Sequence, residues 1–198
     1  MNFKNTITKE ELSLFPAEVF NGKIVEISNE NALEKAISKL EKETMMGFDT
    51  ETRPSFKKGI AGNKTALMQL STQNCCYLLR LNILGFPDCL MKFLSNENVK
   101  KIGLSLKDDF HILRKGQKSF TPKGFIDLQA IAHNYGIEEL SLQKMYAIIF
   151  EKRISKTQRL SNWEAEKLTP AQQQYAALDA WACLQIYRKF IDLGNELI

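Results

Sequence analysis

The sequence predicts an α/β fold in which helices flank a mixed β-sheet. Short apolar or alternating segments, the pattern of β-strands, are confined to the first 104 of the 198 residues. Segments with apolar residues at helical spacing lie between these strands and fill the remainder of the chain. Two strands, 65–71 and 75–79, flank a short polar turn and predict an antiparallel hairpin. Later strands are expected to add in parallel, which makes the sheet mixed.

The chain divides into an N-terminal arm, residues 1–22, which lacks a clean periodicity, and a domain at 23–198. One domain is expected because a chain of 198 residues suits a single core. The expected strands lie at 23–27, 45–50, 65–71, 75–79 and 99–104. The expected helices lie at 9–14, 29–43, 86–94, 107–115, 128–135, 141–149 and 169–192, with an irregular segment at 151–167.

Capping residues mark the later helices. Asp127 can cap the helix at 128–135, and Gly136 can end it because glycine adopts the left-handed conformation of a helix C-terminus. Thr169 and Pro170 begin the last helix: Thr accepts a hydrogen bond from the helix start, and Pro is tolerated at the first helical position.

Composition is that of an ordinary globular protein, with 44% hydrophobic and 25% charged residues. The chain contains no run of about 18 apolar residues, so no transmembrane helix is expected. The polar N-terminus lacks the apolar stretch of a signal peptide. The four cysteines form no CxxC pair, which indicates reduced thiols. We therefore expect a cytoplasmic protein with no membrane partner and no obligate protein partner.

The basic residues are unevenly distributed. Segments 52–64, 114–123 and 152–159 contain no acidic residue and hold 12 of the 27 basic side chains. The rest of the chain then carries 15 basic against 23 acidic residues. Positive loops on an acidic body favour a polyanionic partner such as nucleic acid. Solubilising surface charge is the alternative for any one segment.

A pair of acids lies at the end of the expected strand at 45–50, in the stretch GFDTET. Residues two apart on a strand share a face, so Asp49 and Glu51 are expected to point the same way. Two neighbouring carboxylates repel each other, and a divalent cation removes that conflict. The alternative is that the strand has already ended and both side chains face water.

A second acidic motif, LKDDF, opens the helix at 107–115, just past the end of a strand. Ligand residues often follow strands at this position. We favour Asp109, which directly precedes the aromatic Phe110, and keep Asp108 as the alternative. The alternative for either acid is a carboxylate at the helix N-terminus that is stabilised only by the helix dipole.

The last helix carries an acid in its apolar stripe. Tyr175, Leu178, Ala182 and Ile186 recur at helical spacing, and Asp179 falls within this stripe. A carboxylate is rarely buried unless it is paired or metal-bound. A hydrogen-bonded Tyr–Asp pair with a structural partner is the alternative.

Taken together, the acids predict a centre for hard cations. The set consists of oxygen ligands only, which favours Mg²⁺ or Mn²⁺ over zinc. Paired ions held by carboxylates are the apparatus of phosphodiester hydrolysis.

The ordered motifs DxE at 49–51, Asp109 before an aromatic residue, and YxxxD at 175–179 resemble the DEDDy 3′–5′ exonucleases, the family of RNase D and the exonuclease domain of the Werner syndrome helicase. The resemblance covers residues 23–190 and includes similar stretches at 51–71, 127–145 and 156–180. It implies a ribonuclease H-like fold, with a central mixed sheet between helices. It also implies a metal-dependent 3′–5′ exonuclease that releases nucleoside 5′-monophosphates by a two-metal-ion mechanism.

The resemblance also assigns roles to residues. Asp49, Glu51 and Asp179 would hold the first of two Mg²⁺ or Mn²⁺ ions, Asp49 and Asp109 would serve the second, and Tyr175 would orient the attacking water. The substrate would be single-stranded or 3′-ended DNA, RNA or both. The basic residues expected to grip its phosphates are Arg53, Lys57, Lys58, Lys156 and Arg159.

Two other functions compete with this one. A nucleic-acid-binding module of the same fold would not cut, but such a module would be expected to have lost at least one of the acids. A phosphatase with an aspartate nucleophile would carry DxD, where this chain has Glu51 in place of the second Asp.

Overall fold

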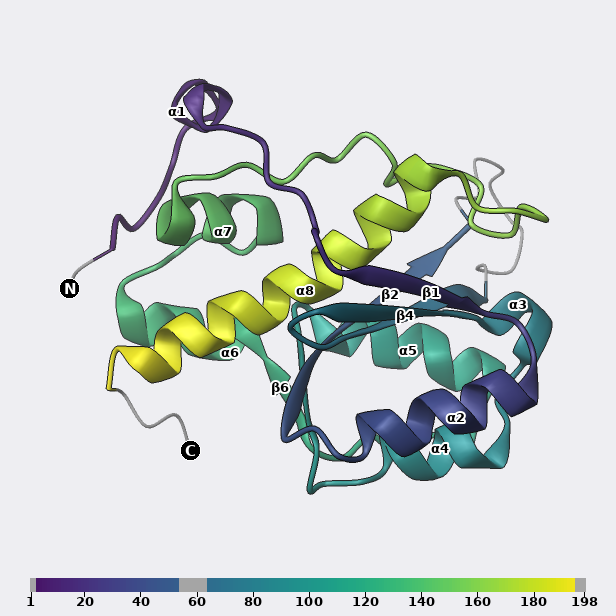
Figure 1. The fold of residues 1–198 in the computed structure, drawn as a ribbon. Coiled ribbons are helices and arrows are strands. Elements are labelled where there is room, and N and C mark those ends of the chain that lie inside the picture. Colours follow the sequence, from purple (N-terminus) through teal and green to yellow (C-terminus); the bar gives the residue numbers. More distant parts are fainter. Residues whose placement is uncertain (1–2, 54–63, 195–198) are drawn as a thin grey trace.

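A six-stranded sheet forms the centre of the computed structural model, which describes residues 3–53 and 64–194 (Figure 1). The strands stand in the order β1-β4-β3-β2-β5-β6. Their bounds are β1 Lys23–Ile27, β2 Met45–Thr52, β3 Thr65–Ser71, β4 Cys75–Arg80, β5 Lys100–Gly103 and β6 Phe125–Asp127. The α/β class and the mixed sheet predicted from the sequence are confirmed.

Strand pairing agrees with the predicted hairpin and departs from the expected order of the parallel strands. β2, β3 and β4 pair antiparallel in succession, and β5 and β6 add in parallel beside β2. β1 also pairs in parallel, with β4, so a parallel strand precedes the hairpin as well as following it. β6 is not among the strands predicted from the sequence, because its three residues are too few to show a period.

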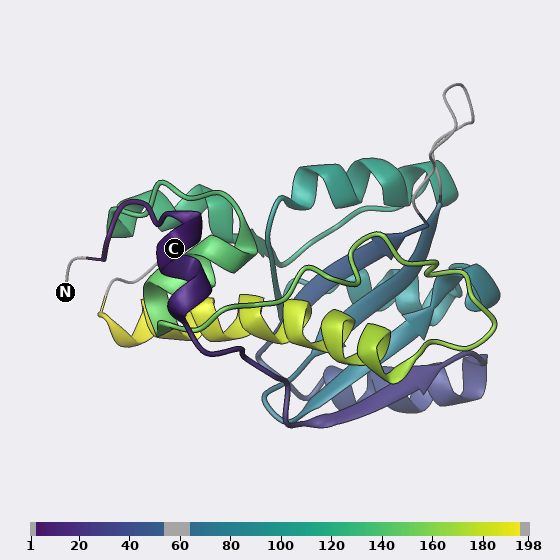
Figure 2. The same cartoon turned by 90° about the horizontal axis from the view of Figure 1, so that it is seen from above.

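The helices lie on both faces of the sheet. One face is covered by α2 and α4, with α5 beside them, and the other by α8, which α6 and α7 cover in turn (Figures 1 and 2). The helices are α1 Lys9–Leu14, α2 Glu30–Leu40, α3 Leu81–Leu84, α4 Asp88–Leu94, α5 Leu106–Gly116, α6 Leu128–Ala132, α7 Leu142–Phe150 and α8 Pro170–Asp192, and a 3₁₀ turn spans His133–Tyr135. Thr169 caps α8 and Asp127 caps α6, as predicted, and Gly136 has the expected left-handed conformation at φ 75°.

A hydrophobic core lies on each face of the sheet, and the side chains of β2 point alternately toward one core and the other. Met46 and Phe48 point into the core beneath α2 and α4. Gly47, Asp49 and Glu51 therefore face the opposite way, toward α8. The central strand thus places its acids on the face that the longest helix crosses.

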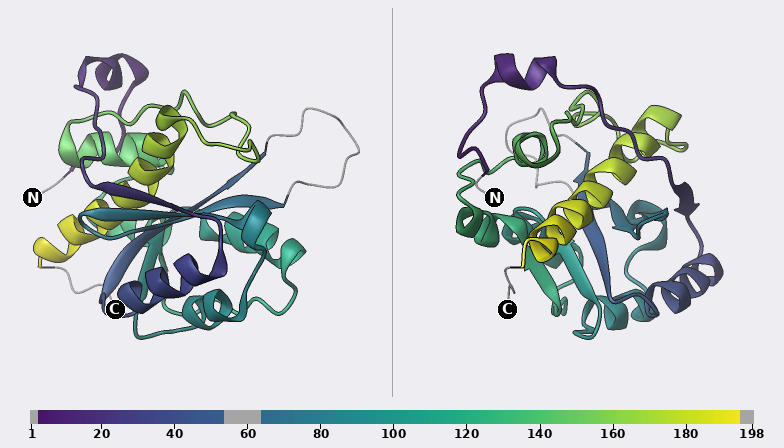
Figure 3. Two further views of the ribbon diagram at one scale, coloured as in Figure 1. Left: turned by 45° about the vertical axis from the view of Figure 1, so that its right-hand side comes forward. Right: turned by 60° about the vertical axis from the view of Figure 1, so that its left-hand side comes forward.

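The N-terminal arm follows α7 and the segment after it (Figure 3). Ile7 and Leu12 bury their side chains against Ala147 of α7. Backbone hydrogen bonds join Arg153 to the arm, from Glu18 N–H to Arg153 O and from Arg153 N–H to Pro16 O, each at 2.9 Å. In the described part of the chain, no helix is both long and apolar enough to span a membrane.

Candidate active site

The acids of the first motif lie within a continuous strand. β2 extends through Thr52, two residues beyond the predicted end, so Asp49 and Glu51 both belong to the sheet. Both side chains are half-buried, where the alternative of a finished strand would have left them in water. Asp49 lies opposite Gln69 and Glu51 opposite Leu67, both on the neighbouring strand β3.

A close approach of α8 to β2 brings the third acid to this pair. A Cβ atom at Gly47 would lie 1.7 Å from the backbone oxygen of Ala180, so no larger residue fits there without movement. Asp179 precedes Ala180 in α8 and is only 8% exposed. One carboxylate oxygen from each of Asp49, Glu51 and Asp179 lies within 4.8 Å of the others.

The helix α8 is buried more extensively than the predicted single stripe. Leu178, Ala182 and Ile186 are buried as expected, but so are residues on other faces of the helix, such as Ala176 and Leu184. The reason is tertiary: the sheet covers one side of α8, and α6 and α7 cover another (Figure 2). Asp179 therefore lies on a helix that is packed on more than one side, and its buried charge needs a partner.

Asp109 approaches the cluster from the other side of β2. Thr50, whose side chain points opposite to those of its neighbours in the strand, donates a hydrogen bond from its hydroxyl to Oδ1 of Asp109. Asp108 instead accepts a hydrogen bond from the Ser105 hydroxyl at 3.1 Å. Of the two adjacent acids, the structure thus brings Asp109 to the β2 carboxylates.

Burial raises the pKa of every acid in the cluster, and repulsion by the other clustered acids adds to it at Asp49 and Glu51. The pKa of Asp49 lies well above its usual range because of burial and then the charges of Glu51, Asp109 and Asp179. Burial, followed by the charges of Asp179 and Asp109, raises the pKa of Glu51 to about 9. Burial raises the pKa of Asp179 to about 7 and that of Asp109 to about 6. Either protons or a cation would relieve this repulsion.

The donor set fits a divalent metal ion. Among the residues that the structure describes, none donates a hydrogen bond to the buried Oδ1 of Asp179, which leaves that oxygen free to bind a cation. Carboxylate oxygens are the ligands that Mg²⁺ and Mn²⁺ prefer.

Tyr175 lies one helical turn before Asp179 and is half-buried. Burial, then the charges of Asp179 and Glu51, raises the pKa of the Tyr175 hydroxyl above its ordinary value. The phenol therefore stays protonated and can donate a hydrogen bond, and such a bond to Asp179 lowers the pKa of that acid. The Tyr175 ring packs against the fully buried Trp163, with ring centroids 5.9 Å apart.

Two of the predicted phosphate-binding residues act electrostatically on the acids. The charge of Arg159 lowers the pKa of Glu51, and that of Lys156 lowers the pKa of Asp179. Arg53 forms an exposed ion pair with Glu164 at 3.3 Å. Lys57 and Lys58 lie outside the described residues.

Arg80, at the end of β4, is a buried cation that the sequence analysis did not single out. It is 1% exposed, contacts Glu26 at 2.6 Å and donates to the backbone oxygens of Ala165 and Glu166. These bonds tie the irregular segment that follows α7 to the sheet. The only signal in the sequence was a charge ending an apolar strand.

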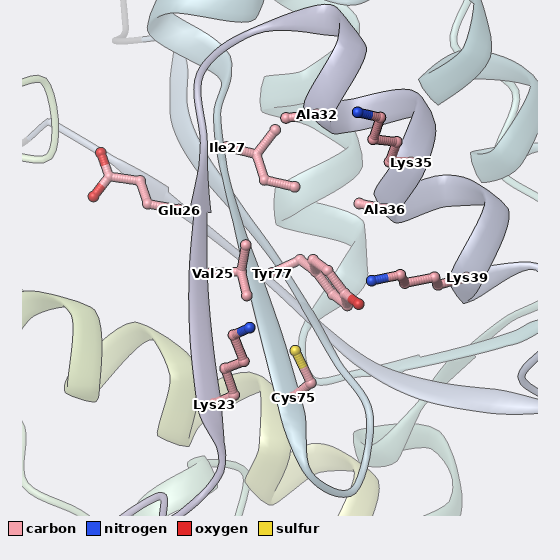
Figure 4. Close-up of a pocket in the computed structure, with 10 residues that line it drawn as sticks. All are labelled: Lys23, Val25, Glu26, Ile27, Ala32, Lys35, Ala36, Lys39, Cys75 and Tyr77. Carbon is pink, nitrogen blue, oxygen red and sulfur yellow. The ribbon is translucent and has the colours of Figure 1, made fainter.

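The pocket shown in Figure 4 lies between β1 and α2, away from the clustered acids. It has a volume of about 290 Å³, and Lys23, Lys35 and Lys39 line it around the ring of Tyr77. Glu26 of β1 points to the opposite side in Figure 4. None of the clustered acids lines this pocket.

The sheet and the acid cluster define an α/β protein with a carboxylate centre suited to divalent cations. Comparison with known families is more specific: the family model described as 3′-5′ exonuclease matches residues 24–194. The chain belongs to this 3′-5′ exonuclease family, and the family predicted from its motifs is confirmed.

Comparison with individual proteins points to the same family. The chain is 31% identical over 186 residues to the bifunctional 3′-5′ exonuclease/ATP-dependent helicase WRN of Mus musculus, an alignment that covers 89% of this chain and 13% of that protein. It is 28% identical over 202 residues to a 3′-5′ exonuclease of Arabidopsis thaliana, covering 92% of this chain and 68% of the relative. The crystal structure of the Aedes aegypti Nibbler EXO domain superposes with a TM-score of 0.82 at 21% identity, over 91% of this chain and 95% of that one. The fold is therefore ribonuclease H-like.

Proposed function

We propose that the domain at 23–198 is a DEDDy-type exonuclease that hydrolyses nucleic acid from the 3′ end and releases nucleoside 5′-monophosphates. The observation that carries this proposal is the convergence of Asp49, Glu51 and Asp179 within 4.8 Å, with Asp109 beside them. Family membership supports the direction of hydrolysis. The arm at 1–22 precedes this domain, and we expect the protein to act in the cytoplasm.

In this proposal the four acids hold two divalent ions, Mg²⁺ or Mn²⁺. Bound metal would supply Lewis acidity and neutralise charge on the phosphate. Asp49, Glu51 and Asp179 provide one set of oxygen ligands, and Asp109 supports the other from the far side of β2. The raised pKa values of these groups mean that protons and metal compete for the same oxygens.

Tyr175 orients the attacking water. Its hydroxyl remains protonated because burial and the acids raise its pKa, and it lies beside the ligand Asp179. A protonated phenol can donate one hydrogen bond and accept another, which suits a group that holds a water in line with a phosphate.

Lys156 and Arg159 bind substrate phosphates next to the acids, since their charges act on Asp179 and Glu51. Arg53, beyond the end of β2, joins them after leaving its exposed pair with Glu164, which costs little because exposed ion pairs are weak. Lys57 and Lys58, which lie outside the described residues, are proposed to bind substrate phosphates as well. The substrate class is single-stranded or 3′-ended DNA, RNA or both.

The test is hydrolysis of 5′-labelled oligonucleotides of DNA and RNA, with 3′-hydroxyl and 3′-blocked ends, in Mg²⁺ and in Mn²⁺. We expect stepwise shortening of the 3′-hydroxyl substrates only, and its loss in the double variant Asp49→Ala/Asp179→Ala. Glu34→Ala, which removes an exposed acid from α2, is the matched control. Wild-type activity in the double variant, or equal cleavage of blocked ends, would contradict the proposal.

A further inference from the structure

We propose that Asp127 is a positioning residue for Asp109. Its carboxylate fixes the β5–α5 turn, and through that turn the first helical turn of α5, which carries Asp109. The inference rests on the proposed function only for the part that Asp109 plays in holding metal. Asp127 ends β6 and lies opposite Gly103, the last residue of β5, so it lies close to the start of α5.

Three backbone N–H groups converge on the Asp127 carboxylate. Oδ1 accepts from Ser105 at 3.1 Å and from Gln129 at 2.9 Å, and Oδ2 accepts from Leu106 at 2.9 Å. Two of these donors open α5, and the third opens α6. One side chain therefore joins the starts of two helices at the end of two paired strands.

The conformation of Ser105 explains why α5 needs an acceptor from another strand. A helix usually begins at a residue in extended conformation whose own side chain accepts from the first turn. Ser105 has φ 61° and ψ 36°, in the left-handed region, a conformation that is strained for a residue with a Cβ atom. Its side chain makes no capping bond and instead donates to Asp108. Asp127 supplies the missing acceptor, and its negative charge favours the positive end of the helix.

Asp109 lies in the turn of helix that this arrangement fixes, three residues after Leu106. Its carboxylate accepts a hydrogen bond from Thr50 of β2, the strand that pairs with β5. Without the Asp127 contacts, the strained Ser105 would relax and the first turn of α5 would move relative to β2. Displacements of about 1 Å in a catalytic group are enough to cost about two orders of magnitude in rate.

Hydrogen exchange of the intact protein tests the positioning directly. In Asp127→Ala, we expect amide exchange in residues 103–110 to rise while exchange in β2 and β3 is unchanged. Titration with Mn²⁺ should show a loss of affinity of about 10–100-fold, the effect of removing a group that orients a metal ligand. Asp127→Asn, which keeps one acceptor oxygen, should fall between Asp127→Ala and the wild type.

A second substitution separates positioning from general destabilisation. Ser105→Gly removes the strain at the left-handed position, because glycine adopts it freely. If Asp127 acts by holding that turn, Ser105→Gly should restore part of the Mn²⁺ affinity lost in Asp127→Ala. The capping control is Asn29→Ala: Asn29 accepts from Ala32 at 2.9 Å at the start of α2, on another part of the sheet. It should lower the unfolding temperature and leave Mn²⁺ affinity unchanged.

The outcomes distinguish this inference from the proposed function. Unchanged exchange in residues 103–110 of Asp127→Ala would overturn the positioning role, and so would unchanged Mn²⁺ affinity in that variant when Asp109→Ala loses it. If exchange rises but Asp109→Ala binds Mn²⁺ like the wild type, the positioning of Asp109 stands and its proposed metal role fails.

Discussion

The β2–α8 junction and the β5–α5 turn each deliver part of the acid cluster, but different forces hold them. At the junction, apolar side chains surround Asp179, and the missing side chain of Gly47 lets the helix backbone touch the strand. At the turn, hydrogen bonds from backbone N–H groups to Asp127 hold a strained residue in place. Close packing fixes three of the acids, whereas polar contacts fix Asp109.

This difference determines how strongly substitutions in each region should affect the protein. A packed junction loses stability when volume changes, since interiors are filled and rearrange at a cost. A turn held by polar contacts loses about 1 kcal/mol per hydrogen bond, so single substitutions should alter the geometry of Asp109 without unfolding the protein. Substitutions at the junction should therefore have larger effects than those at the turn.

The largest effect on stability is expected for Gly47→Ala. Its Cβ would meet the backbone oxygen of Ala180, which cannot move without shifting α8. We expect the free energy of unfolding in urea to fall by about 3 kcal/mol, and Mn²⁺ affinity to fall as Asp179 moves away. The matched control is Gly116→Ala at the end of α5, whose Cβ would meet only the Phe86 side chain. Equal, small losses in both variants would show that the junction is not tightly packed.

Removing a carboxylate from the junction should separate activity from stability. In Asp49→Asn we expect the rate of nucleotide release to fall on the order of 10³-fold, since metal ligands supply several kcal/mol of transition-state stabilisation. The metal-free variant should nonetheless be about 1 kcal/mol more stable at pH 8, because a buried, repelled charge has been removed. Glu34→Gln, an exposed acid on α2, is the control for both measurements. A metal-free variant less stable than the wild type would argue against repulsion in the cluster.

The pH dependence of stability follows from the burial of these acids and, at Glu51, from the repulsion by its neighbours. The pKa is about 7 for Asp179 and about 9 for Glu51 in the folded protein, against ordinary values near 4 in the unfolded chain. The folded state therefore binds more protons in this window, so the metal-free protein should lose stability as pH rises from about 4 to 9. Thermal unfolding in EDTA measures this, and Mn²⁺ should raise the unfolding temperature more at pH 8 than at pH 5.5, because protons compete with metal. A flatter profile in Asp179→Asn would assign the effect to the cluster.

Periodicity predicted most of the fold. The first five strands and the long helices followed from apolar spacing and capping residues, and two acids at spacing two on a strand had to share a face. Local patterns could not predict β6, whose three residues are a strand only because β5 lies beside them. They also missed Arg80, whose partners lie 54 and more residues away.

The acids of the site could be singled out because a buried carboxylate conflicts with its surroundings. Asp179 in an apolar helix shows this conflict within a few residues of sequence. Thr50 and Asp127 show none, since a threonine on a strand and an acid before a helix are ordinary, and their contacts to α5 exist only in three dimensions. Supporting residues of this kind therefore need the structure.

The smallest effect is expected at the contact between the two regions, in Thr50→Val. This nearly isosteric change removes the hydroxyl that donates to Asp109 and that lowers the pKa of its carboxyl group. Because the pKa of Asp109 is about 6 with this bond, its loss should move the pKa higher and reduce activity by up to about tenfold near pH 6, with less effect at pH 8. Thr50→Ser keeps a hydroxyl and should retain the wild-type pH profile. A uniform loss of activity at all pH values in Thr50→Val would mean that the contact helps to fix the position of Asp109 and does not set the pKa of its carboxyl group.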